Sequence, residues 1–495
     1  MSEDRRTLMG TGIMGLDAIL RGGLPSGRIY LVEGAPGVGK TTLGLQFLLE
    51  GIRCRERAMM VSLIETEEEL VEVARSHGWD TGGLHILEIP QTLKAASAAV
   101  QTVFPPGEVE FGEIAGTIVD AVEQYRPQRL LIDSISQLGM LTDNQPQMRS
   151  SVLKIRDLVS QIGATTLFTS SRADRQVAEL DTIVHGTISL RTHNYPFGPI
   201  SRELSIKKMR GHQFVTGRHN YRILTGGLEL FTWRLAPQRA PLTEWQVLSS
   251  GNRHLDDLLG GGLEEGTACL INGTTGAGKS TMASLYVQAA ARRGEASVIF
   301  CFDERKETFL RRSASLNLDI PAYIEQGLID LHQVNTGQVS PGEFTQNVIS
   351  AVEKKDAKVV VIDSLTGYMN TIPGDEQLMR QMHELLSYLS GIGVLTIMVV
   401  TKFGTSGIAE MQIDASYLAD TVIVMRHFEA LGTLRRCIAV LKKRHGRHEH
   451  TIREFKISDG GCEVGPPLTA FNGILTGNPT YFGDREKLMD YGNKE

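Results

Sequence analysis

The sequence predicts an α/β protein of two tandem domains, each a mainly parallel, doubly wound sheet with flanking helices. The pattern G-x-x-x-x-G-K-[ST] occurs twice, at 34–41 and 273–280, 239 positions apart (273 − 34). An apolar run ends in an Asp-Ser pair in both halves, at Asp133 and Asp363. Apolar strand patterns also alternate with helix patterns, which is typical of a parallel sheet covered on both faces.

The repeat period sets the expected domain boundaries. A period near 235 residues is too long for a solenoid repeat and suits two full domains. We expect a first domain over 1–235, a linker over 236–248, a second domain over 249–475 and a polar C-terminal tail over 476–495.

Composition argues against several classes of protein. The net charge is −6, which argues against a dedicated DNA-binding surface, so we expect no DNA partner, although local basic patches remain possible. The five cysteines form no C-x-x-C pair and the N-terminus lacks an apolar core, so we expect reduced thiols and a cytoplasmic location. The longest apolar run, 391–400, spans about half a membrane, so we expect no membrane association.

Both glycine motifs lie between a predicted strand and a predicted helix, which is the setting of a phosphate-binding loop. In such loops the backbone N–H groups hold phosphates, the lysine reaches the β- and γ-phosphates, and the Ser/Thr hydroxyl binds Mg²⁺. The sequence therefore predicts ATP and Mg²⁺ as ligands. The expected nucleotide-binding residues are Gly34, Gly37, Gly39, Lys40, Thr41 and Thr42, with Gly273, Gly276, Gly278, Lys279, Ser280 and Thr281 in the second half.

Two aspartates are the predicted second ligands of the metal. Asp133 and Asp363 end apolar strands, where a carboxylate can hold Mg²⁺ or its water opposite the hydroxyl of Thr41 or Ser280. The alternative interpretation is an ordinary helix cap.

Acidic residues after the second strand of each half are candidate catalytic groups. Glu65 and Glu304 can orient or deprotonate an attacking water or hydroxyl. Asp303 precedes Glu304, whereas Ile64 precedes Glu65, so the first half has one acid where the second has two. The alternative is a solvated acidic loop.

Late in each half lie basic residues that can act across a subunit boundary. Lys208 and Arg210 in the first half, and Lys442 and Arg444 in the second, can reach the γ-phosphate of a neighbouring subunit's nucleotide, as arginine fingers do. A solvated strand edge is the alternative interpretation.

Together these residues resemble the KaiC branch of the RecA/RadA ATPase superfamily over nearly the whole chain. The most specific matches are TGIMGLDAILRGGLPSGR, the IDS strand ends, KKMRG, and the stretch ADTVIVMRHFE…IREFKISDGG at 419–461. The resemblance implies two RecA-like P-loop NTPase domains. It also implies homohexamers of stacked rings with ATP at subunit interfaces, slow hydrolysis in the first ring and self-phosphorylation in the second.

The resemblance further identifies a candidate phosphate acceptor. Clock-type members carry a Ser-Thr acceptor pair before a Thr-Asp-Thr strand, and Ser416 and Tyr417 stand at those positions here. Ser416 is the predicted acceptor and Tyr417 the weaker candidate, while a plain turn serine is the alternative. The C-terminal tail is shorter than the one with which clock members bind KaiA, so we expect no KaiA partner. A KaiB-like or signalling protein stays an open possibility.

Three functions therefore compete. The first is an ATPase and serine autokinase that forms a ring. The second is a RadA-like DNA-binding repair ATPase, which a basic loop or an added DNA-binding module would support. The third is a nucleotide-gated signalling platform with little turnover, which the departures at Ile64 and Tyr417 keep open.

Overall fold

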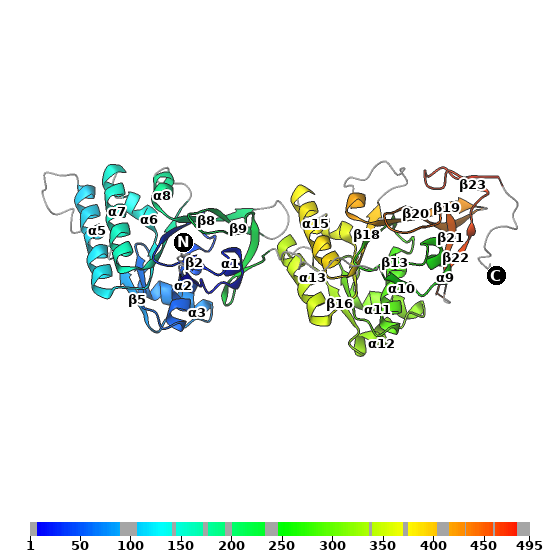
Figure 1. Ribbon diagram of the computed structural model, residues 1–495, viewed down its shortest axis with the longest axis horizontal. Coiled ribbons are helices and arrows are strands. Elements are labelled where there is room, and N and C mark those ends of the chain that lie inside the picture. The colour runs from blue at the N-terminus through cyan, green and yellow to red at the C-terminus, as the bar shows by residue number, and fades with distance from the viewer. Residues whose placement is uncertain are drawn as a thin grey trace, which may run out of the picture. The chain divides into compact units, whose positions relative to one another are not determined.

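The computed structural model (Figure 1) divides the chain into two compact units, Met1–Trp233 and Arg234–Glu495, and each is described by itself. The structure describes residues 7–89, 106–140, 145–171, 177–193, 200–232, 246–335, 339–369, 375–402, 415–430, 432–458 and 461–482.

The first unit is built on a nine-stranded sheet with the order β11-β10-β9-β8-β3-β7-β6-β4-β5. Its strands from β5 to β8 are parallel, and β9, β10 and β11 add an antiparallel extension. The strands are β3 (Ile29–Glu33), β4 (Ala58–Ser62), β5 (Leu84–Glu88), β6 (Arg129–Asp133), β7 (Thr165–Ser170), β8 (Gly186–His193), β9 (Ser201–Met209), β10 (His219–Leu224) and β11 (Gly227–Leu230).

The second unit repeats this topology strand for strand, with the order β16-β15-β17-β18-β14-β19-β20-β21-β22. Parallel pairing again runs from β16 to β19 and antiparallel pairing from β19 to β22. The strands are β14 (Ala268–Thr274), β15 (Ser297–Cys301), β16 (Ile329–Gln333), β17 (Val359–Asp363), β18 (Leu395–Lys402), β19 (Thr421–Ala430), β20 (Thr433–Lys443), β21 (Arg453–Ser458) and β22 (Gly461–Pro467). The predicted fold class, tandem RecA-like α/β domains, is confirmed.

Helices cover both faces of each sheet (Figure 1). In the first unit they are α1 (Met14–Ile19), α2 (Lys40–Arg53), α3 (Glu67–Ser76), α5 (Pro106–Tyr125), α6 (Ile135–Met140), α7 (Gln145–Ile162) and α8 (Val177–Ile183). In the second unit they are α9 (Arg253–Leu258), α10 (Lys279–Arg292), α11 (Lys306–Ser315), α12 (Ile320–Glu325), α13 (Pro341–Lys355), α14 (Leu365–Met369), α15 (Asp375–Gly391) and the short 3₁₀ helix η2 (Ala415–Leu418).

Each sheet has a hydrophobic core on both faces because successive strand residues point to opposite sides. In β14, Ile271 packs with the face covered by α10, α11 and α12, whereas Leu270 packs with the face covered by α13 and α15. In β3, Tyr30 belongs to the core under α2 and Leu31 to the core under α5 and α7. The phosphate loops therefore start from central strands that are buried on both sides.

The helix that follows each acidic candidate starts in a different way. Thr66 and Glu69 form a capping box at the start of α3, with 2.8 Å between the Thr66 amide and Glu69 Oε2. Helix α11 starts after Arg305, whose side chain makes no cap hydrogen bond. Glu69, one of the glutamates after Glu65, therefore has a local structural role.

The proposed domain boundaries fall near short pairs of strands. Residues 233–245 lie outside the described residues, and Val247–Leu248, at the end of the expected linker, form β12, which pairs with β13 (Leu263–Glu264). In the expected tail, Thr480–Tyr481 form β24, which pairs with β23 (Phe471–Asn472). In the first unit, β1 (Leu8–Met9) pairs with β2 (Leu24–Pro25).

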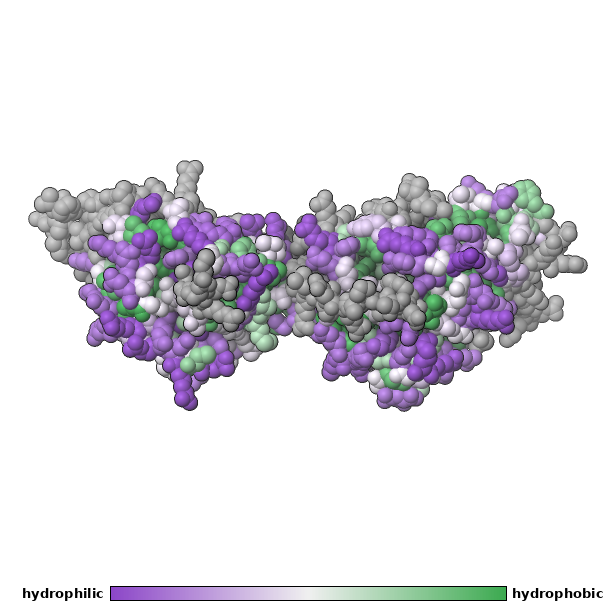
Figure 2. Space-filling view, viewed as in Figure 1, coloured by the Kyte–Doolittle hydropathy of each residue, from purple (hydrophilic) through white to green (hydrophobic). Residues whose placement is uncertain are grey.

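Hydrophilic side chains cover most of the face seen in Figure 2, with apolar residues scattered among them. Such scattered apolar residues are ordinary for a protein surface. No helix within the described residues is long and apolar enough to cross a membrane.

Candidate functional site

The second phosphate loop joins the end of β14 to the start of α10, at the carboxyl edge of the parallel sheet where open α/β sheets bind ligands. Gly278 has φ 99°, and a Cβ atom there would lie 2.5 Å from Ile457 Cδ1. Only glycine fits that position without strain. The glycine lets the loop turn so that Lys279 is the first residue of α10.

Lys279 is buried in this loop, with 6% of its surface exposed. Its Nζ donates to the Thr274 carbonyl at 2.8 Å. Burial lowers the pKa of Lys279 to about 8, although Asp363 opposes the shift. A buried amine of this kind is ready for an anionic ligand, because a phosphate would restore its preference for the charged form.

Ser280 and Asp363 form the predicted hydroxyl–carboxylate pair. Asp363 is the last residue of β17 and accepts a hydrogen bond from the Ser280 side chain. Burial raises the pKa of Asp363, while the Ser280 hydrogen bond and Arg312 oppose the shift. Both groups are hard oxygen donors, as Mg²⁺ requires.

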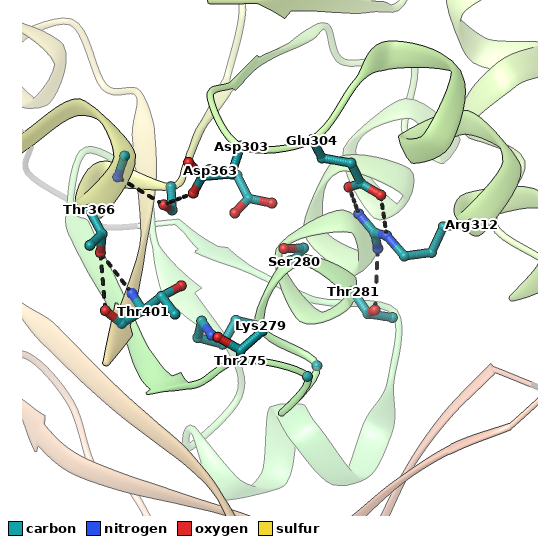
Figure 3. A pocket seen from close by; sticks show the side chains of 14 residues that line it. Thr275, Lys279, Ser280, Thr281, Asp303, Glu304, Arg312, Asp363, Thr366 and Thr401 are labelled. Carbon is teal, nitrogen blue, oxygen red and sulfur yellow. Dashed lines mark hydrogen bonds and ion pairs between the residues drawn. The ribbon is translucent and has the colours of Figure 1, made fainter. Parts of the chain in front are cut away.

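A cavity of about 620 Å³ opens beside this pair (Figure 3). Its volume suits a nucleotide-sized ligand. Among its lining residues are the predicted Gly276, Gly278, Lys279, Ser280, Thr281, Asp303, Glu304 and Asp363. It is also lined by residues that the sequence analysis did not single out as ligands, namely Thr275, Arg312, Ser364, Thr366, Gly367 and Thr401.

The two acids of the second unit are held by different partners. Asp303 accepts a hydrogen bond from the Ser364 hydroxyl, and a Cβ atom on Gly367 would lie 2.3 Å from Asp303 Oδ1. Glu304 is bound by the Arg312 guanidinium through both oxygens, at 3.2 and 2.9 Å (Figure 3). No sequence motif marks Arg312.

The first phosphate loop has the corresponding contacts. Lys40 Nζ donates to the Gly34 and Ala35 carbonyls at 3.0 Å each. Thr41 Oγ1 donates to Asp133 Oδ2 at 2.6 Å. Burial lowers the pKa of Lys40, and Asp133 opposes the shift. The first unit therefore repeats the lysine and the hydroxyl–carboxylate pair.

Glu65 has surroundings unlike those of Glu304. Burial raises the pKa of Glu65, and the charges of Asp133 and Glu69 raise it further. Ile64, at the place of Asp303, is 55% exposed. The glutamate of the first unit thus lies among carboxylates, whereas that of the second unit lies against a guanidinium.

In the second unit, the late basic residues hold the candidate acceptor segment. Lys442 Nζ donates to the Ser416 carbonyl at 3.0 Å, and Arg444 donates to the Tyr417 carbonyl at 3.0 Å. Arg444 also pairs with Asp420 at 3.1 Å. These contacts tie η2 to the end of β20.

In the first unit, the late basic residues contact α8. Lys208 pairs with Asp181 at 3.3 Å, and Arg210 donates to the Thr182 carbonyl at 2.7 Å.

Ser416 is half-buried in η2, and Tyr417 beside it is 52% exposed. The described residues that line the 620 Å³ cavity include neither of them. The structure therefore does not bring the acceptor candidates into the phosphate site of their own unit.

The residues present fit a Mg²⁺–nucleotide ligand. The lysine is buried and favours an anionic partner, and the hydroxyl and the carboxylate are both oxygen donors of the kind that Mg²⁺ prefers. Within the described part of the chain, no group of three or more His, Cys, Asp or Glu could hold a metal without further ligands. A magnesium ion bound chiefly by phosphates and one or two protein oxygens needs no such group.

Comparison with known proteins gives a consistent result. A family model described as "ATPase: KaiC" matches the chain twice, over residues 9–233 and 248–469. The chain is 27% identical over 493 residues to the Circadian clock oscillator protein KaiC of Acaryochloris marina, covering 96% of this chain and 92% of that protein. It is 28% identical over 487 residues to the protein of the same name from Synechococcus elongatus, covering 97% and 93%.

Proposed function

The chain belongs to the KaiC family of ATPases, with two copies of the family domain, and on that premise we propose that it is an ATPase and serine autokinase that works as a ring of identical subunits. The observation that carries this proposal is the repeated phosphate site. Each unit has a glycine loop, a buried or half-buried lysine and a hydroxyl–aspartate pair at the carboxyl edge of the parallel strands of its own sheet.

Hydrolysis is assigned to the first unit. Glu65 accepts a proton from water, the water oxygen bonds to the γ-phosphorus, and the bond from that phosphorus to the bridging oxygen breaks to release ADP. The raised pKa of Glu65 supports this role, because a carboxylate with that environment is a better proton acceptor. Mg²⁺, held by Thr41 and Asp133, would supply charge neutralisation at the phosphates.

Self-phosphorylation is assigned to the second unit. Glu304, helped by Asp303, accepts the proton of the Ser416 hydroxyl, the serine oxygen bonds to the γ-phosphorus, and ADP leaves. Ser416 is not among the described residues that line its own unit's cavity, which supports transfer from ATP that is bound by another copy of the chain. Tyr417 is a second acceptor only if its longer side chain reaches the same phosphate.

In a ring, the basic residues late in each unit can act on the nucleotide of the neighbouring subunit. Lys208 and Arg210 in the first unit, and Lys442 and Arg444 in the second, are proposed to approach the γ-phosphate bound by the neighbouring subunit. A KaiB-like or signalling protein would then read the nucleotide or phosphorylation state of this ring.

Phosphosite mapping by mass spectrometry after incubation with ATP and Mg²⁺ tests the acceptor. We expect a phosphate on Ser416 in the unaltered chain and none anywhere in the Ser416→Ala variant. Tyr417→Phe is the matched control and should keep the Ser416 phosphate. Phosphate at another residue in Ser416→Ala would defeat the assignment. ATP bound per chain, counted by equilibrium dialysis, should fall from two to one in Lys40→Ala and in Lys279→Ala.

A further inference from the structure

The second unit contains an ion pair, Arg312–Glu304, for which the described residues of the first unit hold no counterpart. We propose that Arg312 is a positioning residue that restrains hydrolysis at the second site by binding both oxygens of Glu304. The inference rests on the proposed function, in which Glu304 is the proton acceptor of that site.

The geometry of the pair is that of a two-point clamp. Arg312 Nε lies 3.2 Å from Glu304 Oε1, and a terminal nitrogen lies 2.9 Å from Oε2. The other terminal nitrogen lies 3.4 Å from Thr281 Oγ1. Bidentate guanidinium–carboxylate pairs are strong and directional. Arg312 therefore holds the Glu304 carboxylate near Thr281, the residue that follows Ser280.

The guanidinium is itself held in place by α11. It lies over the ring of Phe309, 5.0 Å from the ring centroid, and Phe309 is 1% exposed. The side chains of Arg312 and Glu304 are each only 27% exposed. The clamp is therefore part of the wall of the cavity and not a transient surface contact (Figure 3).

The first unit provides an internal comparison. Helices α3 and α11 both start two residues after their glutamate, and their seventh residues are Val73 and Arg312. Val73 packs against the hydrophobic core and carries no charge. Glu65 therefore has no guanidinium from that helix position, and its neighbours Asp133 and Glu69 raise its pKa.

The physical consequence is a difference in proton acceptance between the two sites. Both Glu304 oxygens accept hydrogen bonds from the Arg312 guanidinium, so neither oxygen is free to turn toward an attacking water and accept its proton. Water activated at the second site would react slowly, and bound ATP would persist there. Slow hydrolysis of this ATP favours transfer of its γ-phosphate to a protein hydroxyl of a neighbouring subunit.

The test measures phosphate release in a Glu65→Gln background, so that the second site dominates the signal. We expect Arg312→Val, which copies the first unit, to raise kcat about five- to tenfold with little change in KM, a part of the roughly 10²–10⁴-fold that a positioned base supplies. Arg312→Lys keeps the charge but cannot bind both oxygens of Glu304. Its kcat should therefore lie between that of the parent with Arg312 and that of Arg312→Val. Arg311→Val removes an exposed arginine from the same helix and should leave the rate unchanged.

Further variants separate the two claims. Arg312→Met keeps an apolar stem over Phe309, so it reports on the clamp even if Arg312→Val folds poorly. Adding Glu304→Gln to Arg312→Val should remove the gain entirely. If Glu304→Gln alone slows release but neither Arg312 variant raises kcat, the clamp proposal is overturned and the proposed function stands. If Glu304→Gln leaves release unchanged but removes the Ser416 phosphate, the clamp proposal is overturned and the proposed function stands. If Glu304→Gln changes neither release nor the Ser416 phosphate, the proposed role of Glu304 is wrong, and the clamp proposal fails with it.

Discussion

Ser364 donates a hydrogen bond to Asp303, whereas its counterpart Ser134 hydrogen-bonds Ser136, with 2.8 Å between the two hydroxyl oxygens. The difference follows from one residue, because Ile64 stands at the place of Asp303 and offers no carboxylate. Ser364 also accepts a hydrogen bond from the Gly367 amide at 3.2 Å, which ties Asp303 to the start of α14. The second unit therefore fixes an additional acid beside its phosphate site.

Removing that acid should affect the second site only. In Asp303→Ala, we expect self-phosphorylation to slow about tenfold, because Glu304 loses a neighbour that supports proton transfer. Phosphate release by the first site should not change. Ile64→Ala is the matched control and should alter neither activity. The prediction is checked by the initial rate of label transfer to protein, and an unchanged rate in Asp303→Ala would contradict it.

The pH dependence of the first site should follow Glu65. Burial, Asp133 and Glu69 raise its pKa above the ordinary value of 4.5. Only the ionised form accepts a proton, so phosphate release should fall as pH is lowered through that raised pKa. Glu69→Gln removes one like charge and keeps a side chain that can cap α3, so it should move the inflection to lower pH. A pH–rate profile in a Glu304→Gln background measures this, and an inflection that stays in place contradicts the electrostatic explanation.

Magnesium dependence should separate the two sites. Asp363→Asn removes the charge of the proposed second-site ligand, so we expect the Mg²⁺ concentration for half-maximal labelling to rise about tenfold or more. Asp133→Asn makes the same change in the first unit and should shift the Mg²⁺ requirement of free phosphate release instead. Free phosphate and protein-bound label are measured in each variant as the Mg²⁺ concentration is raised. Equal shifts in the Mg²⁺ requirement of both products in either variant would argue against separate metal sites.

Mixing of variants tests whether basic residues act on a neighbour's nucleotide. Arg210→Ala and Glu65→Gln should each lose most phosphate release when assayed alone, because an arginine finger and a positioned glutamate both act in the transition state. In mixed rings, some interfaces combine an intact Glu65 with an intact Arg210 from the other subunit. Activity should then reappear on mixing and subunit exchange. No recovery in rings shown to be mixed would place both residues in the same subunit's site.

The fold could be predicted from the sequence because its signals are local. The apolar run before Asp133 forms β6, and the one before Asp363 forms β17, since such runs end at the carboxyl edge of a parallel sheet. The lysines and hydroxyls of the phosphate loops follow from a motif whose spacing is fixed by the loop itself.

The contacts of Glu304 could not be predicted in this way. Arg312 meets it only because α11 packs with that residue turned toward the cavity, and a single arginine in a helix carries no such signal. The role of Ser416 is harder still to predict from the sequence. The proposed phosphate transfer takes place between two copies of the chain, and the sequence carries no direct signal of how two copies meet.

The most direct measurement of the central claim is incubation with γ-labelled ATP and Mg²⁺, with free phosphate and protein-bound label counted in the same tube. The account predicts that Glu65→Gln loses most of the free phosphate and keeps the label, whereas Glu304→Gln keeps the free phosphate and loses the label. If both variants lose the two products in equal proportion, or if the unaltered chain gains no label, the division of hydrolysis and self-phosphorylation between the two units is contradicted.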